Sequence, residues 1–163
     1  MELGPAERLH QLLMDLVLAA GFMQLDQVIP GQPISVSQAF ALHELDTGVP
    51  LSQQELAARL RLEKSTVSRL AAELERKGLL VRERDPGNRR LYRLRLTDEG
   101  RAVHRRMGIV IHQQYVRWVE NISDTERKAL LAGLTALVRE VHRDPPAWHE
   151  PGPDGGHRDH RRR

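Results

Sequence analysis

Apolar residues recur every three or four positions along most of the chain, a spacing that places them on one face of a helix. Leu9, Leu12 and Leu16 follow it near the N-terminus, and Leu130 and Leu134 follow it near the C-terminus. The pattern predicts six helices, which begin near residues 6, 35, 52, 64, 97 and 123. The first is expected to run to about residue 28, and the last to about residue 143.

Three of the predicted helices begin with the same signature. Ser35, Ser52 and Ser123 are each followed three positions later by Gln or Glu, which predicts a capping box at each helix start. Glu63 precedes the fourth helix, where Ser, Asp or Thr would cap more effectively. Gly78 is expected to end that helix by taking a positive φ.

A two-stranded hairpin is predicted after the fourth helix. Residues 79–84 and 91–96 are rich in strand-forming residues, and apolar side chains alternate with Arg93 and Arg95 in the second segment. Residues 85–88, Asp-Pro-Gly-Asn, form a strong turn signal. The predicted fold class is therefore mainly α (α+β): a winged helix-turn-helix with flanking helices. Such a helix pair can place one helix in a DNA groove, and a basic hairpin beside it can hold phosphates.

The order of elements predicts four parts. Residues 1–34 would hold an N-terminal dimerisation helix, 35–97 the winged helix-turn-helix unit, 98–143 two C-terminal dimerisation helices, and 144–163 a disordered tail. The flanking helices carry long apolar stripes outside the compact unit, and a two-fold homodimer would cover them. Such a dimer would also place two recognition helices about 34–36 Å apart, the spacing of successive major grooves.

Composition and charge narrow the possible functions. The 163 residues include no cysteine, which excludes disulfides and thiolate metal sites. No apolar run is long enough to span a bilayer, and the N-terminus lacks a signal-peptide pattern, so we expect a cytoplasmic protein without membrane contact. The net charge is only +3, but residues 1–63 carry −5 and residues 76–106 carry +7. A basic block of this size is typical of a protein that binds a polyanion.

Catalytic and metal-binding patterns are missing from the sequence. It contains no phosphate loop, no nucleophile elbow and no HExxH motif, which predicts a protein that is not an enzyme and needs no cofactor. His43, His104 and His112 are the candidates for a metal site. His104 and His112 are eight positions apart, however, rather than the four that place two ligands on one helix face. We therefore expect no metal ion, and keep a zinc-responsive regulator as an alternative.

Short motifs in the central region resemble those of one protein family. They are Leu51-Ser52-Gln53-Gln54-Glu55-Leu56-Ala57, Ser65-Thr66-Val67-Ser68-Arg69-Leu70, Leu74-Glu75-Arg76-Lys77-Gly78-Leu79, Arg84-Asp85-Pro86, Arg89-Arg90 and Leu96-Thr97-Asp98-Glu99-Gly100. In this order and spacing the chain resembles a MarR-family winged helix regulator over about residues 6–143. The resemblance implies a homodimer on a palindromic operator in double-stranded DNA, usually a repressor and often released by a small ligand. One departure lies in the hairpin turn, where Asn88 replaces the usual Asp.

Candidate DNA contacts follow from helix geometry and charge. Because Val67 and Leu70 are expected to face inward, their neighbours on the fourth helix face outward, and Arg69 suits a bidentate contact to guanine. The amides that open the third helix suit a phosphate. Arg90 is predicted at the wing tip in the minor groove, with Arg89 on the backbone. The predicted DNA-binding residues are Ser52, Gln53, Gln54, Lys64, Ser65, Thr66, Ser68, Arg69, Arg84, Arg89 and Arg90.

A ligand site is less well defined by the sequence. The family resemblance implies a cavity between the dimer helices and the DNA-binding unit, and six residues are candidates for its lining: Met14, Leu18, Phe22, His43, Met107 and Ile111. The competing interpretation is that they belong to the core, because apolar stripes at helical spacing usually pack. A winged-helix module that binds protein rather than DNA also remains an alternative, as does an activator.

Overall fold

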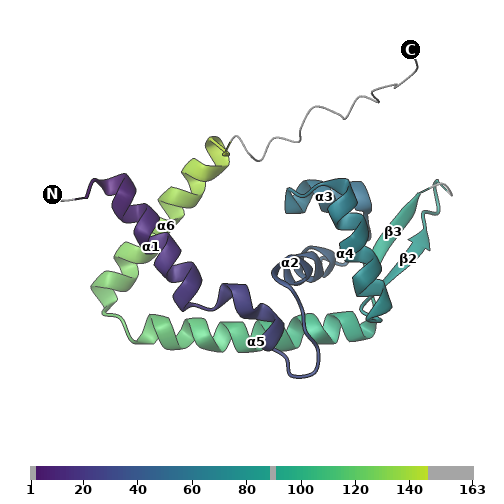
Figure 1. Ribbon diagram of the computed structural model, residues 1–163, viewed down its shortest axis with the longest axis horizontal. Coiled ribbons are helices and arrows are strands. Elements are labelled where there is room, and N and C mark those ends of the chain that lie inside the picture. Colours follow the sequence, from purple (N-terminus) through teal and green to yellow (C-terminus); the bar gives the residue numbers. More distant parts are fainter. Residues whose placement is uncertain (1–2, 89–90, 147–163) are drawn as a thin grey trace, which may run out of the picture. The chain divides into compact units, whose positions relative to one another are not determined.

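The structure is a computed structural model that describes residues 3–88 and 91–146. These residues form six α-helices, a short 3-10 helix and a three-stranded antiparallel sheet (Figure 1). The described residues divide into two compact units, of which the first ends at residue 112 and the second begins at residue 113. The six predicted helices and the predicted hairpin are thus confirmed. Every helix in the described part of the chain is too short or too polar to cross a membrane.

The first predicted helix ends earlier than expected. Helix α1 spans Pro5–Ala19, and Gly21 then takes a φ of 68°, a left-handed conformation that glycine adopts without strain. The chain continues as the 3-10 helix η1, Phe22–Gln27. The prediction of one helix to residue 28 is wrong because the apolar spacing continues through a backbone turn that Gly21 permits.

The winged helix-turn-helix is built on α2 (Val36–Leu45), α3 (Gln53–Leu60) and α4 (Lys64–Arg76). The predicted capping boxes at Ser35 and Ser52 are both present and fix the starts of α2 and α3. Between α3 and α4, Arg61 takes a left-handed φ of 53°, which turns the chain sharply. Gly78 ends α4 with a φ of 72°, as predicted.

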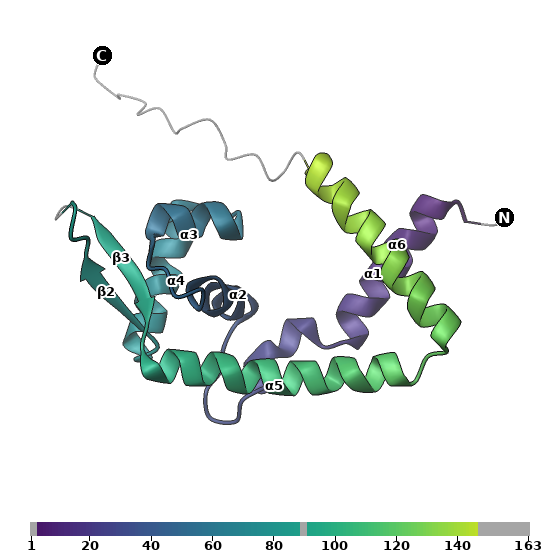
Figure 2. The ribbon, with the colours of Figure 1, turned by 180° about the vertical axis from the view of Figure 1, so that it is seen from behind.

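The sheet contains one strand that the sequence pattern does not predict. Strands β2 (Leu80–Arg84) and β3 (Tyr92–Leu96) form the expected hairpin, which lies beside α4 in both views (Figures 1 and 2). Strand β1 (Leu51–Ser52) pairs with the other edge of β3, so the strand order is β1-β3-β2. Two residues are too few for an alternation signal, which explains why β1 was missed.

Helix α5 (Asp98–Glu120) begins in close contact with the sheet. Its start is capped by Thr97, whose hydroxyl accepts a hydrogen bond from the Gly100 amide at 3.0 Å. A Cβ atom at Gly100 would lie only 2.0 Å from the backbone oxygen of Leu79. A side chain is therefore excluded here, and glycine allows the helix to approach the end of α4.

The hydrophobic core lies entirely between Ile34 and Met107. Its largest fully buried members come from α2, α3, α4, the sheet, the first turns of α5, and the links just before α2 and β2. They are Ile34, Leu42, Leu56, Val67, Leu74, Leu79, Leu80, Leu94, Leu96 and Val103. Packing within a single chain therefore fixes the surroundings of α4, the candidate DNA-reading helix.

The second unit contains the end of α5 and helix α6 (Asp124–Arg143). The predicted capping box at Ser123 is present, and Arg127 donates to the Val119 carbonyl oxygen at 3.2 Å. Within the described residues, however, α6 buries none of its side chains. Its exposed large apolar residues are Leu130, Leu131, Leu134, Val138 and Val141.

Candidate nucleic-acid interface

Helix α4 has one buried face and one polar face. Val67, Leu70, Ala71 and Leu74 lie in the core, which confirms the predicted inward positions. The polar face carries the predicted contact residues, of which Lys64, Ser65 and Arg69 are exposed and Thr66 and Ser68 are half-buried. The core therefore fixes which side of α4 faces away from the protein.

Arg69, on this polar face, has no partner among the described residues. Its guanidinium forms no hydrogen bond or ion pair with any residue in the described ranges. At the start of the helix, Glu63 occupies the cap position but makes no capping hydrogen bond within the same ranges. The first amides of α4 are thus left without a side-chain acceptor, and Arg69 keeps all its donors available.

Three arginines of the hairpin are paired instead. Arg93 lies 2.6 Å from the Glu55 carboxylate, Arg95 pairs with Glu83, and the buried Nε of Arg82 lies 3.2 Å from Glu75 without hydrogen-bond geometry. The carboxylates come from three elements: Glu55 from α3, Glu75 from α4 and Glu83 from β2.

Asp85 organises the described part of the wing turn. Its carboxylate accepts hydrogen bonds from the amides of Gly87 (2.7 Å) and Asn88 (3.0 Å) and from Arg93 Nε (2.5 Å). The Arg93 hydrogen bond, followed by the two backbone amides, lowers the pKa of Asp85. Asp85 therefore supplies a fixed negative charge in a turn where Asn88 supplies none.

The remaining wing residues are placed only in part. Arg84 lies with its guanidinium carbon 5.5 Å from the centre of the Tyr92 ring, a cation–π arrangement. Arg89 and Arg90 lie outside the described residues, so their predicted contacts with the DNA backbone and minor groove stay predictions.

The start of α3 is fixed by its capping box and by the wing. Glu55 accepts the Ser52 amide at 2.7 Å, while the Ser52 hydroxyl accepts the Glu55 amide at 3.1 Å. Hydrogen bonds from the backbone and side chain of Ser52, with the nearby Arg93, lower the pKa of Glu55. Gln53 is half-buried and Gln54 is exposed. Arg93 thus joins the wing turn to the start of α3 through Asp85 and Glu55.

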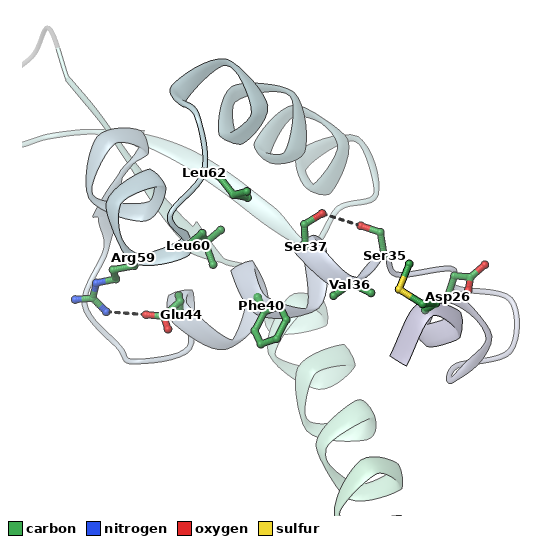
Figure 3. A pocket seen from close by; sticks show the side chains of 10 residues that line it. Asp26, Ser35, Val36, Ser37, Phe40, Glu44, Arg59, Leu60 and Leu62 are labelled. Carbon is green, nitrogen blue, oxygen red and sulfur yellow. Dashed lines mark hydrogen bonds and ion pairs between the residues drawn. The ribbon is translucent and has the colours of Figure 1, made fainter. Parts of the chain in front are cut away.

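The first unit also contains a pocket of about 750 Å³. Figure 3 shows it between η1, α2 and the end of α3, with the Arg59–Glu44 ion pair (3.2 Å) at one side. Its lining residues are Met23, Asp26, Ser35, Val36, Ser37, Phe40, Glu44, Arg59, Leu60 and Leu62. Apolar walls beside a few charged groups suit an amphipathic small molecule.

The six residues predicted to bind a ligand do not line this pocket. Met107 is buried in the core, and Ile111 packs against the core. Met14 and Leu18 are exposed on α1, Phe22 is half-buried, and His43 is exposed. Their assignment to a ligand site therefore stays a prediction.

Two of the three candidate histidines lie together. The rings of His43 and His104 are 5.5 Å apart, and His104 Nδ1 lies 2.6 Å from an Asp46 carboxylate oxygen. Across residues 3–88 and 91–146, no three His, Asp or Glu side chains form a group suited to holding a metal ion. His104 is thus oriented by Asp46.

Comparisons with known proteins agree with this architecture. The family model described as MarR family matches residues 32–91. A putative transcriptional regulatory protein for the hcr operon of Thauera aromatica is 33% identical over 95 residues, which are 58% of this chain and 57% of that protein. The chain spans about half the length of the curated relatives it matches.

Solved structures are similar over nearly their whole length. FabT of Streptococcus pneumoniae, crystallised in complex with DNA, has a TM-score of 0.74 at 23% identity, covering 85% of this chain and 98% of FabT. The PcaV transcriptional regulator of Streptomyces coelicolor, in complex with its natural ligand, has a TM-score of 0.65 at 27% identity, covering 90% of this chain and all (100%) of PcaV. The family-model match over residues 32–91, the related sequences and the shared winged-helix fold thus identify a MarR-family winged helix in this chain.

Proposed function

We propose that this protein binds double-stranded DNA sequence-specifically and regulates transcription. The observation that carries the proposal is the polar face of α4, where Arg69 is exposed and has no partner among the described residues, while the opposite face of the helix is buried in the core. An α-helix fits the major groove of B-DNA, and a free guanidinium can donate to O6 and N7 of one guanine. The regulatory protein of Thauera aromatica supports this function, and FabT shows that the fold is compatible with DNA.

The proposal includes a homodimer on a palindromic operator. Helices α1 and α6 bury none of their residues within the described chain, yet both carry leucines at helical spacing. A second copy would cover these stripes, and a two-fold axis would repeat the recognition helix for the second half of a palindrome. The protein would act in the cytoplasm, where it meets the genome.

Repression relieved by a small ligand completes the proposal. The pocket is lined both by η1, which follows α1, and by α2 and α3 of the winged helix, so an occupant would contact both parts of the first unit. Phe40 in its wall is 59% exposed, which leaves an aromatic surface for a ligand to cover. PcaV, which shares the fold, was solved with its natural ligand bound.

Selection of bound duplexes from a random DNA pool tests the DNA-binding function. The full-length protein should enrich a palindromic sequence and shift it at low salt, with affinity falling as salt rises. Arg69→Ala should weaken binding by about 1–3 kcal/mol per half-site, roughly 5- to 150-fold. No enriched sequence and no specific complex at low salt would favour a winged-helix module that binds protein.

A further inference from the structure

Gln38 is a buried polar residue at the junction of α2 and α4. Only 4% of its surface is exposed, and its side chain meets three partners. Its Oε1 accepts hydrogen bonds from Lys77 Nζ (2.8 Å) and from the Ser35 amide (3.3 Å), and its Nε2 donates to Glu73 Oε2 (2.7 Å). The bond to Glu73 spans 35 positions of sequence and is not needed for the capping box at Ser35.

The orientation of the Gln38 amide follows from its partners. The Lys77 ammonium and the Ser35 amide are donors only, so they require the oxygen of Gln38. The nitrogen is then left facing the Glu73 carboxylate, which can only accept. Lys77 is further held by the Pro33 carbonyl oxygen at 2.5 Å. Gln38 is thus fixed as a donor to Glu73, and Lys77 is occupied elsewhere.

Glu73 lies on the same side of α4 as Arg69. Both residues line a hollow of about 210 Å³ together with Thr66 and Gln38. They are four positions apart, a spacing at which opposite charges attract each other on a helix surface. The described residues nevertheless contain no Arg69–Glu73 ion pair, and the Glu73 carboxylate is bonded to Gln38 instead.

We propose that Gln38 is a positioning residue that holds the Glu73 carboxylate away from Arg69 and so keeps the Arg69 guanidinium available to a guanine. This inference rests on the proposed function, because it assigns Gln38 a role in the DNA contact of α4. Gln38 acts through Glu73 and needs no contact with DNA itself.

The variant Gln38→Glu tests the hydrogen bond between Gln38 and Glu73 and changes little else. Glutamate keeps the size of the side chain, an acceptor for Lys77 and a capping-box residue. It replaces the donor that faces Glu73 by a negatively charged oxygen, which repels Glu73 toward Arg69. The matched rescue is Gln38→Glu combined with Glu73→Gln, because Gln at position 73 can donate to Glu at position 38 and restores the bond with its polarity reversed.

Binding of the full-length protein to the duplex selected from the random pool is measured by fluorescence anisotropy. The measurement is made at pH 8, above the usual range of carboxylates. An ion pair at this spacing competes by a factor of about two for each recognition helix, hence about four for a dimer. Gln38→Glu should therefore bind about four-fold more weakly, the double variant should regain wild-type affinity, and Glu73→Gln alone should bind at least as tightly as wild type.

Thermal unfolding of each variant separates positioning from folding. If Gln38→Glu disturbs the fold, Gln38→Met fills a similar volume without a donor and should lose the same affinity, again regained with Glu73→Gln. Wild-type affinity in Gln38→Glu, or a double variant as weak as the single one, overturns the inference while Arg69→Ala still tests the proposed function. If the pool yields no specific duplex, or Arg69→Ala binds like wild type, the proposed function and this inference both fail.

Discussion

Helices α4 and α6 are stabilised in opposite ways. α4, with 13 residues, buries four side chains, but its cap position is held by Glu63, which makes no capping hydrogen bond among the described residues. α6, with 20 residues, begins with a complete capping box at Ser123 but buries nothing within the same part of the chain. The candidate DNA-reading helix is fixed by the core, whereas α6 is fixed at its start and presents an apolar stripe.

The difference shows which helix is buried within a single chain and which helix would be buried only by a second copy. Because one face of α4 is buried, its opposite, polar face is held in one orientation. Recognition of a DNA sequence by this helix requires such an orientation. The stripe of Leu130, Leu134, Val138 and Val141 on α6 repeats every three or four residues, which is the pattern of a helix that packs on another surface. Homodimerisation, as proposed, would give α6 the burial that α4 already has.

The largest effect is expected from truncating the buried face of α4. Leu74 is 0% exposed, and Leu74→Ala removes a buried side chain and leaves a cavity, so the free energy of unfolding should fall by about 2–5 kcal/mol. Urea unfolding of wild type and variant at a low and at a high protein concentration measures this. Because the loss lies inside one chain, a fall in stability that disappears at high protein concentration would contradict the assignment of Leu74 to the core of the monomer.

The matched change on α6 should act on association instead. Leu134 is 47% exposed in one chain, and if a second copy covers it, Leu134→Ala should weaken the dimer by about 1.5–3 kcal/mol per chain. Sedimentation equilibrium of the full-length protein measures the dissociation constant. Lys128→Ala, an exposed polar position on the same helix, is the control and should leave it unchanged. Equal dimer affinity in the Leu134 variant would remove α6 from the proposed interface.

Changes to the helix caps should make α4 and α6 more alike in stability, with a smaller effect than the two leucine substitutions. A serine at position 63 can accept an amide at the start of α4, so Glu63→Ser should raise the free energy of unfolding by about 1 kcal/mol. Ser123→Ala removes the cap of α6 and should reduce the helicity and local stability of that helix by a similar amount. Circular dichroism and amide hydrogen exchange report the two changes. No gain in the Glu63 variant would mean that another group already satisfies those amides.

Local features of the fold were readable from the sequence because their causes are local. The three capping boxes, the positive φ of Gly78 and the inward positions Val67 and Leu70 depend on residues within one or two turns of each other. The early end of α1 also has a local signal in Gly21, but the apolar periodicity obscured it.

Contacts that join distant segments were not readable in the same way. Arg93 reaches Glu55 across 38 positions and Gln38 reaches Glu73 across 35, and neither pairing leaves a pattern in a single sequence. The charge count at the hairpin therefore could not show that Arg82, Arg93 and Arg95 lie against carboxylates. Arg69 gains importance for the same reason, because no described residue pairs with it.

The smallest effect is expected from lowering the pH, which should weaken both the wing beside α4 and the cap of α6. The pKa values of Asp85 and Glu126 are lowered from 3.8 and 4.5, the first mainly by Arg93 and the second by the Ser123 side chain and then its amide. A lowered pKa in the folded state means that each carboxylate stabilises the fold above its unfolded value. That stability is lost as pH falls below about 4.5 and then 3.8, toward the lower folded values.

Asp85→Asn tests the wing without touching α6. The amide retains one acceptor for Gly87 but carries no charge for Arg93, so exchange of the Gly87 and Asn88 amides should be faster than in wild type at neutral pH and should change less on acidification. Glu126→Gln is the matched variant, which should alter exchange at the start of α6 and leave the wing amides unchanged. Both are measured by amide hydrogen exchange between pH 3 and pH 7. If Asp85→Asn keeps the full acid sensitivity of the wing, a different carboxylate holds the turn to α3, and Glu55 is the other carboxylate paired with Arg93.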